Sequence, residues 1–109
     1  MYQVVTSDSR LSGVMDLWVT GFEFTDTGNV LFSGDWEIVS AGQVVWSADF
    51  VGLESANYLA GKPFQLSVSG EAQGSAANAG STLHYRVHRA SADWTHPSNS
   101  TLTLKAYIE

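Results

Sequence analysis

Residues 30–51 form two runs of alternating apolar residues joined by a short turn of small residues, and this pattern constrains the fold more than any other. The alternation places the two tryptophans of this stretch, Trp36 and Trp46, on the same side as the other large apolar residues. Such alternation is typical of half-buried antiparallel strands, and the turn is typical of a hairpin. We therefore expect a β-hairpin whose inner face, with both tryptophans, belongs to the core.

A loop of three residues, 40–42, brings the two apolar faces into phase. With Gly42 in the left-handed conformation, such a loop places Trp36 opposite Trp46. A loop of two residues would place Trp46 opposite Glu37 and set the faces out of phase. The expected cross-strand pairs are Ile38 with Val44, Trp36 with Trp46, Gly34 with Ala48 and Phe32 with Phe50.

Short strands and small polar turns also account for the rest of the chain. Between 14 and 24 the apolar phase changes after Gly21, which predicts a bulge or bend at Thr20-Gly21 that keeps Phe22 and Phe24 buried. Similar alternation predicts further strands near the N-terminus and over residues 64–68, 83–87 and 101–108.

This strand content predicts one all-β domain over residues 1–109. A single open sheet would leave half of its apolar face in water, so two packed sheets are expected. We predict an antiparallel β-sandwich of seven to eight strands with jelly-roll or Greek-key connections.

Composition excludes several classes of function. The chain has no cysteine, so thiol chemistry, zinc-thiolate sites and disulfides are absent. A net charge of −6 with only five Lys and Arg argues against nucleic-acid binding, which needs many cations on one surface. The chain begins without a basic segment followed by a long apolar run, so we expect no signal peptide and no membrane partner. No motif indicates a cofactor.

Basic and titratable side chains gather on one predicted strand, at His84, Arg86, His88 and Arg89. The two histidines are four residues apart, which on a strand is roughly 13 Å and too far for both to bind one metal ion. One interpretation of this stripe is an ordinary solvated outer face, and the other is an electrostatic docking face.

Acidic side chains point outward on the predicted hairpin, at Asp35, Glu37 and Asp49. They would pair with the basic stripe inside the fold if the two strands are adjacent, or between subunits if they are not. We favour pairing between subunits, because copies arranged around an axis can join unlike surfaces.

The polar segment 91–99 carries Trp94 beside Asp93 and His96. A tryptophan next to a carboxylate is a common arrangement for stacking a sugar ring and binding its hydroxyls. In the other interpretation, which we favour, Trp94 caps the open end of the sandwich or packs on a neighbouring chain. Catalysis is the least supported class, because no Ser, His and Asp stand in a recognisable nucleophile motif.

The composition is acidic, cysteine-free and lysine-poor, and it accompanies a small-residue loop over 70–81 and a short alternating strand over 100–109. In these features the chain resembles the small β-sandwich and jelly-roll proteins of bacteriophage particles, including capsid decoration or cement proteins and fibre-tip domains. The resemblance covers the whole chain without a specific motif, so it transfers no functional residue. It implies a non-enzymatic virion part, often trimeric, made in the host cytoplasm.

We therefore expect a capsid decoration or cement protein that binds copies of itself and a major capsid or other virion protein. The 70–81 loop and both chain ends are expected to contribute contacts. The alternative is a carbohydrate-binding module or a receptor-binding fibre tip. The expected interface residues are Arg86, His88, Arg89, Trp94, Asp35, Glu37 and Asp49, and the glycan-binding alternative uses Trp94, Asp93 and His96.

Overall fold

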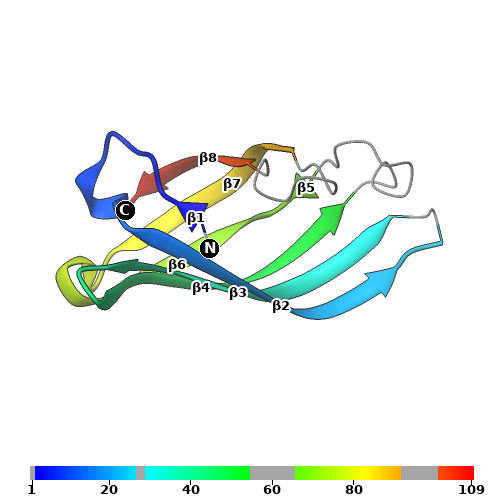
Figure 1. Cartoon of the computed structure of the whole chain (residues 1–109), viewed down its shortest axis with the longest axis horizontal. Helices are drawn as coiled ribbons and strands as arrows, with labels where there is room; N and C mark the ends of the chain where they lie inside the picture. Colours follow the sequence, from blue (N-terminus) through cyan, green and yellow to red (C-terminus); the bar gives the residue numbers. More distant parts are fainter. Residues whose placement is uncertain (1, 27–28, 55–65, 92–100) are drawn as a thin grey trace.

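The computed structural model describes residues 2–26, 29–54, 66–91 and 101–109, and these form a single antiparallel β-sheet that curls into a half-barrel (Figure 1). The strand order is β1-β2-β3-β4-β6-β7-β8, with β5 paired to β4. The strands are β1 (Tyr2–Gln3), β2 (Val14–Phe24), β3 (Val30–Ser40), β4 (Gln43–Glu54), β5 (Leu66–Ser67), β6 (Ser69–Gly74), β7 (Thr82–Ser91) and β8 (Thr101–Ile108). Two short 3₁₀ helices, η1 (Ser9–Leu11) and η3 (Ala76–Asn78), lie between strands.

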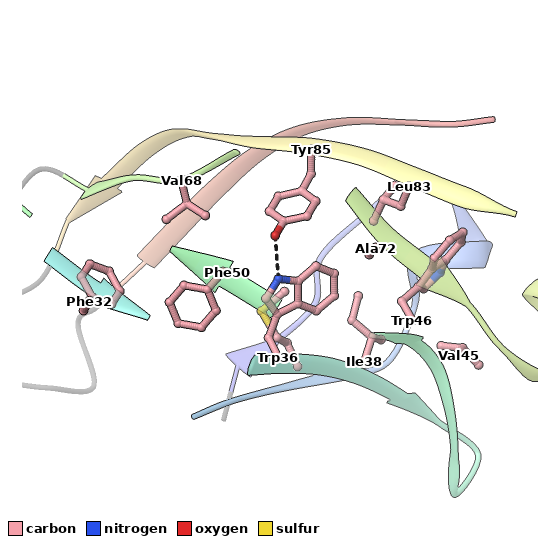
Figure 2. Close-up of a cluster of buried hydrophobic side chains, with 11 residues drawn as sticks. Phe32, Trp36, Ile38, Val45, Trp46, Phe50, Val68, Ala72, Leu83 and Tyr85 are labelled. Atoms are coloured by element: carbon pink, nitrogen blue, oxygen red, sulfur yellow. Dashed lines mark hydrogen bonds between the residues drawn. The ribbon is translucent and has the colours of Figure 1, made fainter. Parts of the chain in front are cut away.

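The prediction of an all-β antiparallel fold is confirmed, and the prediction of a sandwich is wrong. Most strands pair with their neighbours along the chain, so the described strands form a meander rather than a Greek key or jelly roll. The sandwich was expected because one open sheet leaves its apolar face wet. Curling keeps this apolar face out of water, since the inner face of β3 and β4 packs against the inner face of β6 and β7 (Figure 2).

Aromatic side chains from opposite parts of the sheet fill the concave core. Trp36 and Trp46 are 4% and 0% exposed, which confirms the predicted division of faces. Tyr85 reaches down from β7 and accepts a hydrogen bond of 3.1 Å from the Trp36 indole (Figure 2). The smallest core residue, Ala72, is fully buried on β6. Small residues on β6 therefore leave room for the large rings of β3, β4 and β7.

The turn between β3 and β4 differs from the predicted three-residue loop. Ser40 pairs with Gln43, so only Ala41 and Gly42 form the turn, with φ of 51° and 78°. Two successive positive φ values are typical of a type I′ turn. A β-bulge at Val45 then adds the extra residue inside the strand.

The bulge also changes the predicted cross-strand partners. Val44 pairs with Val39, and the next pair is Trp46 with Ile38. Trp36 is opposite Ala48 rather than Trp46, so the predicted pairing of the two tryptophans is wrong. The faces nevertheless stay in phase, because one additional residue has the same effect on alternation in the strand as in the loop.

A second bulge lies where the sequence predicted it, at Thr20 on β2. Val19 pairs with Gly34 and Gly21 pairs with Ser33, so Thr20 is the extra residue. A Cβ at Gly34 would collide with the Trp18 carbonyl oxygen, which explains why glycine is needed beside this bulge.

The expected burial of the two phenylalanines beyond this bulge is wrong. Phe22 and Phe24 are 61% and 56% exposed. β1 pairs only with Val14 and Met15, so no other described strand covers the outer edge of β2 after Met15. Alternation identifies the inner face of a strand and does not show whether that strand is at an edge.

Residues 70–81 are largely ordered structure rather than the predicted loop. Residues 69–74 form β6, which pairs with β7 over five residue pairs, and η3 follows. Asn78 is buried and its amide donates a hydrogen bond of 3.2 Å to the Arg10 carbonyl. The Trp46 indole donates a second hydrogen bond of 2.7 Å to the same oxygen. These two bonds fasten the segment around η1 to the sheet.

Candidate functional site

The hydrogen-bonded ladder of the sheet is interrupted between β4 and its neighbours β5 and β6. Ser47 pairs with Gln73 at one end of the interruption, and Leu53 pairs with Ser67 at the other. The two pairs are six positions apart on each strand, so the register is the same on both sides. Residues 48–52 therefore face residues 68–72 without ladder pairs, and the sheet opens there.

A cleft of about 450 Å³ lies on the outer face at this opening. Its lining also includes Trp36 and Ala48, a cross-strand pair whose side chains belong to the inner face. Carboxylates dominate the outer-face lining. The other lining residues are Trp18, Asp35, Glu37, Ser47, Asp49, Glu71 and Gln73.

Three residues of this cleft form a row across β2, β3 and β4. Trp18 is directly opposite Asp35, which is directly opposite Asp49. Trp18 is 48% exposed, and both aspartates are exposed. The hydrogen bond that the protonated Asp35 carboxyl donates to Asp49 raises the pKa of Asp35, and partial loss of hydration and the negative charge of Asp49 act in the same direction. Two carboxyl groups are thus held together beside an exposed indole.

The predicted outward position of the acidic residues is confirmed. Asp35, Glu37 and Asp49 lie on the outer face, and all three line the cleft. The sequence analysis missed Trp18 and Glu71 as members of the same site. Trp18 could have been found, because it is the one aromatic residue on the polar side of its strand.

The predicted basic stripe divides into two parts. The His84 ring contacts two carboxylates, because its Nδ1 is 3.3 Å from Glu71 and its Nε2 is 2.6 Å from Glu109. Its ring stacks on Tyr107 at a centroid distance of 4.6 Å. Arg86 is exposed on the outer face, and His88 is exposed next to a register shift of β7. Arg86 is directly opposite Lys105 on β8, which the sequence analysis did not include.

The remaining predicted site residues lie outside the part of the chain that the structure describes. These are Trp94, Asp93 and His96, together with the side chain of Arg89. Their roles at an interface or in glycan binding stay predictions.

Exposed apolar side chains cluster where β2, β3 and β4 run beyond the bulge. On the inner face of β2, Val19 is 53% exposed, and Phe22 and Phe24 meet edge to face with ring centroids 5.1 Å apart. On the outer face, Leu31 is directly opposite Leu53, and both are partly exposed. We call these residues, together with Val51, the apolar end of the sheet.

A second cavity of about 630 Å³ lies where the first and last strands of the curled sheet approach each other. Tyr2, Val4 and Met15 line one side, and Leu102 and Leu104 of β8 line the other. Its lining includes no charged side chain. This cavity is the open seam of the half-barrel.

Residues 2–26, 29–54, 66–91 and 101–109 contain neither a cluster of metal-ligating side chains nor a helix suited to crossing a membrane. No group of three or more His, Cys, Asp or Glu side chains there is arranged to hold a metal ion. In the same ranges, no helix has the length and apolar character that crossing a membrane requires. Comparisons with protein-family models, with curated proteins and with solved structures find no match for this chain.

Proposed function

We propose that this chain is a non-enzymatic structural protein of a phage-like particle, a capsid decoration or cement protein. It would be made in the host cytoplasm and would bind both other copies of itself and the particle lattice. The observation that carries the proposal is the apolar end of the sheet. Large exposed apolar patches on a protein of this size commonly mark interaction surfaces.

The apolar end offers both faces and one edge of the same sheet to a partner. Phe22 and Phe24 are exposed on the inner face, and Val51 is 61% exposed on the outer face. Beyond Met15, the edge of β2 that faces away from β3 has no strand partner among the described residues. Because free edges with apolar side chains favour pairing with other chains, a partner that covers this end would bury both the side chains and the edge.

Co-sedimentation with the particle tests the proposal. Capsids prepared without this chain are mixed with it and pelleted, and saturable binding at a fixed ratio to the capsid protein is expected. The double variant Phe22→Ser/Phe24→Ser should lose binding. Tyr107→Ser is the matched control, because Tyr107 is an exposed aromatic residue near the opposite edge of the sheet. Absence of wild-type binding, or equal binding by the Phe22/Phe24 variant, would contradict the proposal.

A further inference from the structure

Two acidic residues with like charge stand directly opposite each other on the outer face. Asp35 and Asp49 form a cross-strand pair of β3 and β4, and both are exposed. Like charges in this position destabilise a sheet. The hydrogen bond to Asp49 and the negative charge of that residue both raise the pKa of Asp35. We call these two residues the acidic pair.

Two basic residues form the counterpart on the outer side of β7 and β8. Arg86 of β7 is directly opposite Lys105 of β8, and both are exposed. Neither makes an ion pair with another described residue. By contrast, Arg10 is bound by both carboxylate oxygens of Asp8. We call Arg86 and Lys105 the basic pair.

The two pairs do not neutralise each other within one molecule. β6 lies between β4 and β7, so the pairs are separated by at least two strand spacings, about 10 Å. Ser69 is the residue of β6 that faces Arg86, and it carries no charge. Glu71, the acid of β6, contacts His84 instead. Because Trp36 of β3 and Tyr85 of β7 meet across the core, the neighbouring acidic and basic pairs point outward on opposite sides of the curled sheet.

We propose that a second copy of this chain docks on the outer face, with the basic pair of one copy against the acidic pair of the other. This inference rests on the self-association in the proposed function and names the surface that makes it. Charge complementarity of this kind selects the partner and its orientation. Since the two pairs lie on opposite sides of each copy, the contact joins unlike surfaces head to tail and forms once per neighbour, as around a ring.

The cleft beside the acidic pair suits an incoming guanidinium or ammonium group. Its volume of about 450 Å³ leaves space for a side chain of this kind beside Asp35 and Asp49, which both line it. Trp18 lies next to Asp35 and is 48% exposed, so its ring can stack on a cation that binds the two carboxylates. The site thus combines two negative charges with an aromatic face.

A charge-exchange experiment tests this docking mode without any particle. The acid-reversed variant is Asp35→Lys/Asp49→Lys, and the base-reversed variant is Arg86→Glu/Lys105→Glu. Each variant alone should associate at least about tenfold more weakly than wild type in sedimentation-velocity measurements. An equimolar mixture of the two variants should recover association, because opposite pairs then face each other again.

The control variant is Asp16→Lys/Glu23→Lys. It makes the same change in net charge on the outer face of β2, away from the acidic pair, and it should associate as wild type does. Circular dichroism and urea unfolding should be used to check that all three variants fold. Raising salt from about 50 to 500 mM should weaken wild-type association, because exposed charges are screened.

Four results would overturn the inference: a monomeric wild type, full association of either variant alone, no recovery in the mixture, or a control that fails like the acid-reversed variant. A wild type that stays monomeric but binds a lysine-rich peptide at the cleft would assign the acidic pair to another basic partner, which also overturns it. Capsid co-sedimentation distinguishes a failure of this docking mode from a failure of the proposed function. Variants that lose self-association and still bind capsids leave lattice binding intact, whereas self-associating wild type that never binds capsids contradicts the virion role alone.

Discussion

The Trp36 indole nitrogen donates a hydrogen bond of 3.1 Å to the Tyr85 hydroxyl, and the two rings meet edge to face with centroids 5.2 Å apart. The residues are 49 positions apart in the chain. The bond joins β3 to β7 across the concave core (Figure 2). It is therefore a direct link between the two halves of the curled sheet.

Tyr85→Phe should lower the free energy of unfolding by about 1–3 kcal/mol, because the buried indole N–H loses its acceptor while the ring packing stays. Urea unfolding followed by tryptophan fluorescence measures the change. Tyr107→Phe is the control, since Tyr107 is 64% exposed, and it should change stability by less than about 0.5 kcal/mol. Equal effects of the two substitutions would show that the Trp36–Tyr85 bond contributes nothing particular.

Phe22 and Phe32 are directly opposite each other on β2 and β3, yet they are 61% and 7% exposed. Phe32→Ala should cost about 3–5 kcal/mol because it leaves a cavity against Phe50. Phe22→Ala should cost less than about 1 kcal/mol in the isolated chain. Denaturant unfolding of both variants measures the difference. A large loss for Phe22→Ala would mean that the apolar end is structural and not available to a partner.

Alternation of apolar residues predicted which face each strand turns inward, and the structure agrees for the described parts of β3, β4 and β7. Trp36, Trp46 and Leu83 are all buried. Alternation did not predict cross-strand partners, because an extra residue in the loop and a bulge at Val45 produce the same phase. Pairing depends on turn geometry, and Ala at the first turn position gave little sign of a type I′ turn.

The sandwich prediction failed for a related reason. An apolar face indicates that something covers it, without indicating whether the cover is a second sheet or the same sheet curled over. For the site, the outward positions of Asp35 and Asp49 were predictable from alternation, whereas their cleft was not. The cleft depends on the interrupted ladder between β4 and β6, and on Glu71 lying across that interruption, which are long-range features.

Ala41 offers a direct test of the turn. It is a non-glycine residue with φ of 51° at the first central position of a type I′ turn, where asparagine and glycine are favoured. Ala41→Asn should raise the free energy of unfolding by a few tenths to about 1 kcal/mol, because asparagine tolerates this conformation better. Gly42→Ala should destabilise the chain, since φ there is 78°. Thermal unfolding of both variants measures the effects, and the opposite order would argue for the three-residue loop.

The acidic pair predicts a specific dependence of stability on pH. The pKa of Asp35 is raised in the folded chain above its ordinary value of 3.8, chiefly by the hydrogen bond with Asp49. Between pH 3.8 and this raised value, the folded state binds more protons at Asp35 than the unfolded state does. The contribution of Asp35 to the free energy of unfolding is therefore fully present below this window and is lost as pH rises through it.

Asp49→Asn removes the neighbouring charge and replaces the carboxyl partner with an amide. The variant should lose less stability than wild type as pH rises through the window above 3.8, because an amide N–H can donate to the Asp35 carboxylate and favour its ionised form. Urea unfolding at pH steps from about 3 to 7, with carboxyl NMR titration of Asp35, measures both consequences. Glu23→Gln, on the same outer face, controls for the change in net charge. If the Asp49→Asn profile follows that of wild type, then the two carboxyl groups do not share a proton and the acidic pair behaves as two independent surface residues.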